Sequence, residues 1–340
     1  MSSVDLIVAG GGPVGLATAI EARLRGLTVA IIEPRASAID KACGEGLMPG
    51  ALPALARLGV DPVGFPLRGV SYRARGSRID HRFVGGEGRG VRRTALHTAL
   101  SERARELGVQ TITGRVDSLV DDGDGVDVGD LRGRYLVGAD GLHSSVRRMA
   151  GLERSPGRAR RFGIRRHFVM EPQSELIEVY WTPDAEAYVT PVGDGVVGVA
   201  VLGPQGTRFD AVIEAIPELA ERIRGREPAS ELRGAGPFGQ RTSAQSAGRV
   251  LLVGDASGYV DAITGEGIRV GLAQARVAID AIAADDPASY DRAWAAETRQ
   301  FRLLTSGLVA AARSPLRGVI VPAAVALPRV FGGIVERLAV

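Results

Sequence analysis

The chain has 340 residues, of which 45% are hydrophobic and 24% charged, a balance typical of globular proteins with a buried core. Its formal net charge is only +3, and its arginines are scattered among acidic residues along the whole chain. No basic tract with interleaved aromatic residues occurs, so the sequence argues against nucleic acid as a partner. Cys43 is the single cysteine and the four histidines lie far apart, which excludes an intramolecular disulfide and gives no metal-binding motif.

The first residues lead directly into an apolar strand, and we see no charged segment followed by an apolar leader before that strand. The best candidate for a membrane span, residues 318–327, is short and broken by Pro322. We therefore expect a cytoplasmic protein of one large domain or two interleaved domains.

The opening of the chain, residues 5–33, has the order strand, glycine turn, helix, strand and acid. Gly10 permits the tight turn, Gly12 lets the backbone approach a pyrophosphate, and Gly15 lets the helix lie close to the sheet. The free N–H groups and the positive dipole end of that helix would face the phosphates. Glu33 follows the second strand and can accept hydrogen bonds from a ribose hydroxyl, so this segment predicts a dinucleotide site.

The remaining elements follow from apolar periodicity and from glycine and proline signals. The turn at 121–125 superficially resembles a calcium loop, but it lacks the terminal glutamate, so a solvated hairpin tip is the better interpretation. Residues 165–202 contain short alternating stretches that predict a second sheet covering the cofactor. In chain order we expect a helix at 51–58, antiparallel strands at 69–84, a helix at 94–107, strands within 109–128, the covering sheet, a strand at 249–253, a helix from about 266 to 284, and helices over the last fifty residues.

Two further motifs make the dinucleotide prediction more specific. The first is the apolar strand that ends in Gly138-Ala139-Asp140-Gly141, within residues 135–147. The second is Gly254-Asp255 after another apolar strand, followed by Gly265-Glu266-Gly267-Ile268 at the start of a helix. An aspartate flanked by glycine can approach a sugar hydroxyl closely, and a helix start directs its positive dipole end at negative charge on a ligand.

With the N-terminal fingerprint, these motifs resemble the three marks of the superfamily of single-component FAD-dependent monooxygenases, such as the aromatic hydroxylases, and geranylgeranyl reductases. The resemblance covers most of residues 1–285. It implies an α/β fold in which a Rossmann-like FAD-binding domain of the glutathione reductase type is interleaved with an antiparallel β-sheet substrate domain and followed by C-terminal helices. We expect the FAD-binding domain at 1–70, 85–160 and 240–286, the substrate domain at 71–84 and 161–239, and the helical segment at 287–340.

The resemblance also implies a set of FAD-binding residues. Asp255 would hold the ribityl chain, and Asp140 with Gly141 would form the second contact region. Arg93 is similar to an arginine that the family places near the cofactor, although a surface arginine at a helix start is the plainer alternative. Ala262 departs from the proline that many relatives carry there. The expected set is Gly10, Gly12, Pro13, Val14, Gly15, Glu33, Arg35, Arg93, Asp140, Gly141, Gly254, Asp255, Gly265, Glu266, Gly267 and Ile268, with no metal.

Two chemistries agree with this resemblance. The favoured one is an NADH- or NADPH-using monooxygenase of secondary metabolism, which hydroxylates or epoxidises a hydrophobic aromatic, polyketide or terpenoid substrate through a flavin C4a-hydroperoxide. The alternative is a reductase of isoprenoid or quinone side-chain double bonds, because residues 41–47 are similar to the Cys-Gly loop of the prenyl reductases. Cys43 separates the two: it is either a functional thiol beside the flavin or a small buried hydrophobe. A non-catalytic flavin-binding protein is a third class.

Partners follow from the same reading. The chain has a single glycine fingerprint, so a nicotinamide reductant would dock transiently and leave. The C-terminal helices carry arginines among Leu, Val, Ile and Ala, which permits peripheral membrane contact or a grip on a greasy substrate, while a kinked helical pair packed on the domain is the alternative. Tyr180, Trp181, Tyr188 and Tyr259 are candidates for a substrate pocket, although aromatic residues at such spacing also form cores.

Overall fold

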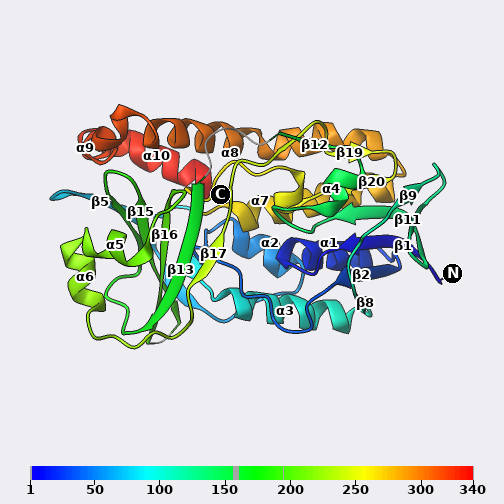
Figure 1. Ribbon diagram of the computed structural model, residues 1–340, viewed down its shortest axis with the longest axis horizontal. Coiled ribbons are helices and arrows are strands. Elements are labelled where there is room, and N and C mark those ends of the chain that lie inside the picture. Colours follow the sequence, from blue (N-terminus) through cyan, green and yellow to red (C-terminus); the bar gives the residue numbers. More distant parts are fainter. Residues whose placement is uncertain (1, 156–160, 194, 340) are drawn as a thin grey trace.

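The computed structural model describes residues 2–155, 161–193 and 195–339. The domain boundary expected at residue 160 falls in residues 156–160, outside the described part. Figure 1 shows two β-sheets at opposite ends of an elongated molecule, with helix α8 running alongside both.

The first sheet has eight strands, with a central parallel path β20-β11-β1-β2-β8 and antiparallel strands β19, β10 and β9 at its margins. Its strands are β1 (Ser2–Ala9), β2 (Val29–Glu33), β8 (Gln110–Thr113), β9 (Val120–Asp121), β10 (Val126–Val128), β11 (Leu131–Gly138), β19 (Ser246–Ala247) and β20 (Val250–Leu252). The 121–125 turn is the tip of the β9–β10 hairpin, as expected, and Asp121 and Asp122 accept backbone N–H bonds there.

Alternate side chains of each parallel strand point to opposite faces of this sheet. Both faces are apolar, so both must be covered. In β1, Leu6 and Val8 pack against the helical layer, whereas Ile7 and Ala9 pack beneath the hairpin and α4. The helical layer buries one face of the strands, and the β9–β10 hairpin with α4 buries the other. Because β1, β11 and β20 are parallel, their carboxyl ends lie at one edge of the sheet. The helices are α1 (Pro13–Leu24), α2 (Ala51–Arg57), α3 (Arg93–Glu106), α4 (Ser145–Met149) and α7 (Gly267–Ala283).

The second sheet has seven strands in the order β17-β13-β16-β15-β14-β5-β6. It is antiparallel as expected except that β5 pairs with β14 in parallel. A parallel pair needs a long crossover, and here the chain crosses through the first sheet between the two strands. The strands are β5 (Gly69–Ala74), β6 (Ser77–Arg82), β13 (Arg161–Val169), β14 (Leu176–Trp181), β15 (Glu186–Gly193), β16 (Val196–Pro204) and β17 (Arg233–Ala235).

Helices α5 (Phe209–Glu214) and α6 (Pro217–Ile223) pack on the outer face of this second sheet. Two small sheets are separate from the two large ones: one contains β3 (Gly46–Leu47), β7 (Gly88–Gly90) and β4 (Phe65–Leu67), and the other contains β12 (Glu153–Arg154) and β18 (Arg241–Thr242). The inner face of the second sheet packs in part on the C-terminal helices and in part lines a cavity.

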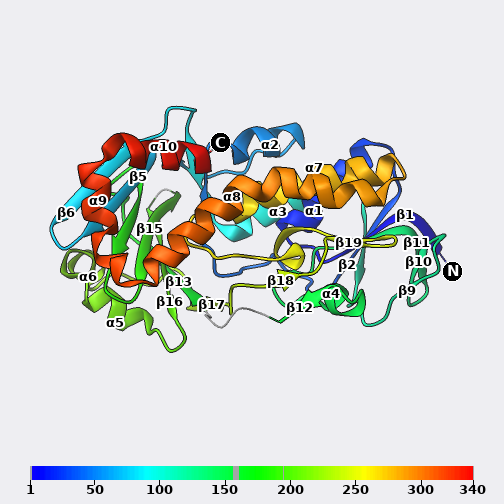
Figure 2. The ribbon, with the colours of Figure 1, turned by 90° about the horizontal axis from the view of Figure 1, so that it is seen from above.

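The chain ends in helices, seen from above in Figure 2. They are α8 (Tyr290–Ala312), α9 (Ile320–Ala326) and α10 (Pro328–Ala339), with single-turn segments η1 (Gly254–Ser257), η2 (Pro287–Ser289) and η3 (Pro315–Val319) between elements. No single helix of the described chain has the length and apolarity to cross a membrane; only Pro287–Ala312 and Pro315–Ala326 taken together do, and a 98° bend separates them.

Candidate functional site

A cavity of about 830 Å³ lies between the edge of the first sheet and the inner face of the second. Almost every residue expected to bind a cofactor lines it, and so does Cys43. The two exceptions are Gly15 and Glu266. The expected residues on its wall are Gly10, Gly12, Pro13, Val14, Glu33, Arg35, Arg93, Asp140, Gly141, Gly254, Asp255, Gly265, Gly267 and Ile268.

The glycine turn after β1 has the geometry that a phosphate site requires. Gly10 has φ +104°, and a Cβ on Gly15 would lie 1.9 Å from the Gly10 carbonyl oxygen, so Gly15 shapes the turn from beneath the cavity. A Cβ on Gly12 would meet nothing within 4 Å, because the space beyond it is open. Helix α1 begins there with Pro13 and no side chain caps it. Its first N–H groups therefore face the cavity and can bind an anion.

Glu33 is buried at the end of β2, and its carboxylate is already heavily hydrogen-bonded. Its Oε2 accepts from Gly11 N at 2.7 Å, and its Oε1 accepts from the backbone N of Arg35 at 3.0 Å and from Arg35 Nε at 2.7 Å. Burial raises the pKa of Glu33, but hydrogen bonds from Arg35 and Gly11 outweigh it, so the pKa lies below its usual value. A ribose hydroxyl would share this carboxylate with the half-exposed Arg35 side chain.

Two polar atoms on the cavity wall are buried without a protein partner. Arg93 is 6% exposed, and its Nη1 has no acceptor among the described residues. Asp140 caps helix α4, because its Oδ2 accepts from Ser145 N at 2.7 Å and from Val146 N at 3.2 Å, yet its Oδ1 has no donor there. A buried donor and a buried acceptor without partners are costly, and a polar ligand in the cavity would satisfy both.

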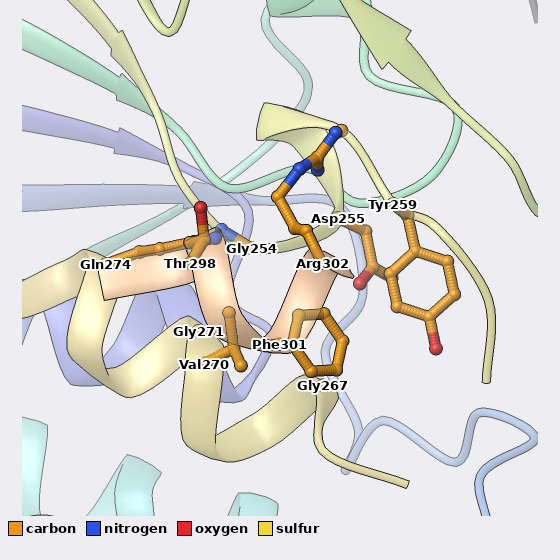
Figure 3. Close-up of a pocket in the computed structure, with 11 residues that line it drawn as sticks. Gly254, Asp255, Tyr259, Gly267, Val270, Gly271, Gln274, Thr298, Phe301 and Arg302 are labelled. Carbon is orange, nitrogen blue, oxygen red and sulfur yellow. Dashed lines mark hydrogen bonds between the residues drawn. The ribbon is translucent and has the colours of Figure 1, made fainter. Parts of the chain in front are cut away.

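The Gly254-Asp255 motif lies at the C-terminal end of β20. Asp255 Oδ2 is 2.8 Å from Nζ of Lys41, the only lysine in the chain. On the other side of the motif, Gly254 N donates to Gln274 Oε1 at 2.6 Å, which ties the turn to α7. A second, much smaller pocket lies beside this motif, between α7 and α8. Figure 3 shows it, with Asp255 and Tyr259 at one side and Gln274 at the other. The volume of this small pocket is about 20 Å³, which is room for one water molecule, so the pocket is too small for an organic ligand.

Helix α7 begins with its N-terminus at the cavity, where Gly265, Gly267 and Ile268 line the wall. The side chain of Glu266 is an exception to the expected set. It is buried outside the cavity and its Oε2 is 2.6 Å from Arg269 Nε, while burial raises its pKa to about 7. The Glu266 carboxylate thus pairs with Arg269 in the first turn of α7, and contact of Glu266 with a cofactor stays a prediction.

The loop that carries Cys43 is fixed by Glu45. Glu45 has φ +60° and is buried; its Oε1 accepts from Arg93 N at 2.8 Å and its Oε2 lies 2.5 Å from His167 Nε2. Glu45 N in turn donates to Cys43 Sγ at 3.4 Å. One carboxylate thus joins the loop to the start of α3 and to β13, and it holds the thiol at the cavity wall.

The far wall of the cavity is apolar and comes from the second sheet. Alternation in β5 and β14 directs Val70, Tyr72, Ile177 and Val179 inward. Of the four aromatic candidates, Tyr188 and Tyr259 line this cavity, whereas Tyr180 and Trp181 do not. Burial and Asp255 raise the pKa of Tyr259 well above its usual value, so its hydroxyl remains a hydrogen-bond donor.

Sequence reasoning missed Lys41, Glu45 and the four apolar residues as site residues. The period-2 pattern in 69–74 and 176–181 indicated strands, but it could not say which face meets a cofactor. Together, the uncapped α1 and α7 termini, the open space at Gly12 and the partnerless atoms of Arg93 and Asp140 fit FAD.

Comparison with known proteins agrees with this geometry. The model of the family described as FAD binding domain matches residues 3–285. The chain is 27% identical to menaquinone reductase of Mycolicibacterium smegmatis over 85% of this chain and 79% of that protein. It is 27% identical to digeranylgeranylglycerophospholipid reductase 2 of Methanopyrus kandleri over 83% of this chain and 78% of that protein. Rifampicin monooxygenase of Streptomyces venezuelae is 28% identical over 80% of this chain but only 62% of its own length.

Solved structures share the fold at lower identity. The flavin-dependent brominase Bmp2 superposes with a TM-score of 0.85 at 18% identity, covering 99% of this chain and 94% of its own. The halogenase PltM in complex with phloroglucinol and FAD superposes with a TM-score of 0.73 at 15% identity, covering 90% and 74%. These likenesses show the α/β fold expected from the sequence.

Proposed function

The chain belongs to the FAD binding domain family and is an FAD-dependent oxidoreductase, and from its site we propose that it reduces a carbon–carbon double bond in an isoprenoid or quinone side chain. This choice reverses the order favoured by the sequence alone, which placed oxygenation first. The observation that carries it is the position of Cys43, on the wall of a cavity that also contains the flavin motifs and an apolar sheet face.

The position of Cys43 supports reduction because this chemistry needs a proton donor beside an apolar chain. Bound and reduced, FAD supplies a hydride, which saturates an alkene together with one proton. The Cys43 thiol would give that proton from Sγ, because the hydrogen bond from Glu45 N holds the sulfur at the wall. The thiol then regains a proton from water. The alkene would thus gain two hydrogens, the hydride from the bound cofactor and the proton from Cys43.

The rest of the cavity would bind and orient the two reactants. The N-terminus of α1 would hold the pyrophosphate of FAD, and the N-terminus of α7 would stabilise negative charge on the flavin ring. Tyr72, Ile177 and Val179 would bury an isoprenoid chain and exclude water from the reacting carbons. NADH or NADPH would reduce the flavin by docking transiently.

The two curated reductases support this proposal through their coverage, since each match extends over more than three quarters of both proteins. Oxygenation is the second candidate, and the match to rifampicin monooxygenase favours it. In that case the same apolar wall would hold an aromatic or terpenoid substrate, and its role would be to exclude water and to position the carbon that is oxidised.

The decisive experiment incubates the FAD-loaded protein with NADPH or NADH and menaquinone, or a geranylgeranyl lipid, and analyses the product by mass spectrometry. We expect a product heavier by two hydrogens, formed equally without oxygen. Incorporation of one labelled oxygen atom from O2 would instead establish the monooxygenase.

Variants then test the thiol. We expect Cys43→Ser to lower turnover about 10²- to 10⁴-fold while FAD content stays the same, because a hydroxyl is a much weaker acid. Ser37→Ala, an exposed change in the same loop, is the matched control and should behave like the parent. If Cys43→Ser retains parental turnover while Tyr259→Phe loses it, the proton comes from the tyrosine.

A further inference from the structure

The C-terminal helices present an apolar surface that nothing in the described chain covers. Between residues 316 and 334 six large apolar side chains are exposed: Leu316, Val319, Val325, Leu327, Val330 and Ile334. Leu316 is 62% exposed, Leu327 58% and Val330 57%. Single exposed apolar residues are ordinary, but six within one short stretch of consecutive helices indicate an interaction surface. We call these six residues the C-terminal apolar face.

Folding explains only the opposite side of these helices. Val321 of α9 and Phe331 and Val335 of α10 are buried in the same apolar cluster as Tyr72 and Ile177 of the second sheet. Glu336 anchors α10 from that side, because its Oε1 is 2.7 Å from His81 Nε2 and accepts from Val84 N at 3.0 Å. The helices are thus held by their inner faces, while the six side chains of the C-terminal apolar face remain exposed.

The charged residues within this stretch of the chain have one sign. Residues 302–335 contain four arginines and no acidic residue, and Arg337 follows Glu336. Arg317 is used internally, since its Nη1 lies 2.6 Å from Glu186 Oε1. Arg313, Arg329 and Arg337 are exposed and form no ion pair with other described residues.

Exposed apolar residues together with nearby arginines favour one binding partner over another. In a two-fold dimer through this face, each arginine would approach the arginines of the second copy, which is unfavourable. The surface of an anionic bilayer offers apolar depth for Leu327 and Val330 and negative headgroups for the arginines. We propose that the C-terminal apolar face docks the protein on an anionic lipid bilayer.

Docking there would bring the bilayer beside the cavity. Phe331 of α10 packs edge-on against Tyr72, with ring centroids 5.0 Å apart, and Tyr72 lines the cavity. Helix α10 therefore lies between the apolar wall of the site and the proposed bilayer contact. This step rests on the proposed function: an isoprenoid chain dissolved in the bilayer would reach the cavity past Phe331. The docking itself stands without it.

Vesicle sedimentation tests the docking directly, with no need for substrate. The FAD-loaded full chain is mixed with vesicles of phosphatidylcholine alone or with added phosphatidylglycerol, and the bound fraction is measured. We expect binding to vesicles that contain phosphatidylglycerol, with binding reduced at high salt. Leu327→Glu combined with Val330→Glu should reduce the partition constant at least about tenfold, because two exposed apolar side chains no longer enter the bilayer. Arg329→Gln should reduce it about fivefold on the anionic vesicles.

The matched control is Val120→Glu, which changes an equally exposed valine at the opposite end of the molecule and should bind like the parent. FAD absorbance and thermal unfolding verify that each variant is folded. Two results would overturn the proposal: equal partition of the double variant and the control, or a parent that ignores vesicles and forms a dimer that Leu327→Glu dissociates. Turnover of a substrate dispersed in solution is measured in parallel. Normal turnover without vesicle binding would mean that only the docking proposal fails, whereas absent turnover would mean that the proposed function fails.

Discussion

Replacing Glu45 by glutamine tests how the Cys43 loop is held, because the change keeps the shape of the side chain and removes only its charge. The carboxylate accepts two hydrogen bonds, from Arg93 N and from His167 Nε2. Arg165 Nη1 is 3.0 Å from His167 Nδ1, and an arginine can only donate. Nδ1 is therefore the acceptor and Nε2 carries the hydrogen.

A glutamine at this position cannot satisfy both donors. Its oxygen can accept from Arg93 N or from His167 Nε2, but its amide group then faces the other N–H, donor against donor. Leaving one buried donor unpaired costs about 1–3 kcal/mol. Glu45→Ala leaves both donors unpaired and should cost roughly 2–6 kcal/mol, about twice the cost of one unpaired buried donor.

Two measurements follow the effect. Urea unfolding of the FAD-loaded protein gives the loss of stability, and the rate at which Cys43 reacts with a thiol reagent reports the opening of its loop. We expect both variants to unfold at lower urea and their thiol to react faster. Glu102→Gln is the matched control, since it makes the same change on the exposed side of α3. If Glu45→Gln matched this control in both measurements, the donor–donor argument would be refuted.

Two further predictions concern carboxylates of the site. Glu33→Ala should weaken FAD binding about 10- to 150-fold, because a charged acceptor worth roughly 1.5–3 kcal/mol is lost, and fluorescence titration of the flavin-free protein would measure it; an unchanged Kd would contradict the ribose assignment. Burial raises the pKa of Glu266 to about 7, above its value in the unfolded chain, so its stabilising contribution is present at low pH and is lost as the pH rises through about 7. Unfolding free energies at about pH 5 and pH 8 should therefore differ less in Glu266→Gln than in the parent, and an equal difference would show that Glu266 is not responsible.

The sequence by itself determined the features that are local in the chain. Helix α3 spans Arg93–Glu106 where 94–107 was expected, and α7 spans Gly267–Ala283 where about 266–284 was expected. The turn at Gly10 could be predicted because a left-handed residue and a close helix leave glycine as the only choice at two fixed positions. A cofactor that binds to backbone N–H groups at helix starts leaves its mark in such short patterns, so the FAD prediction followed from three of them.

Only the tertiary structure decided which side chains act together. Glu45 and His167 are 122 residues apart in the chain, and no pattern within either segment indicates their contact. The same holds for Tyr72 and Ile177, which come from separate segments joined by the parallel β5–β14 pairing. Glu266 shows the converse, since its motif was visible but the direction of its side chain depends on the packing of α7. Backbone turns are set by steric limits on neighbouring residues, whereas the site wall is set by how distant strands and helices pack.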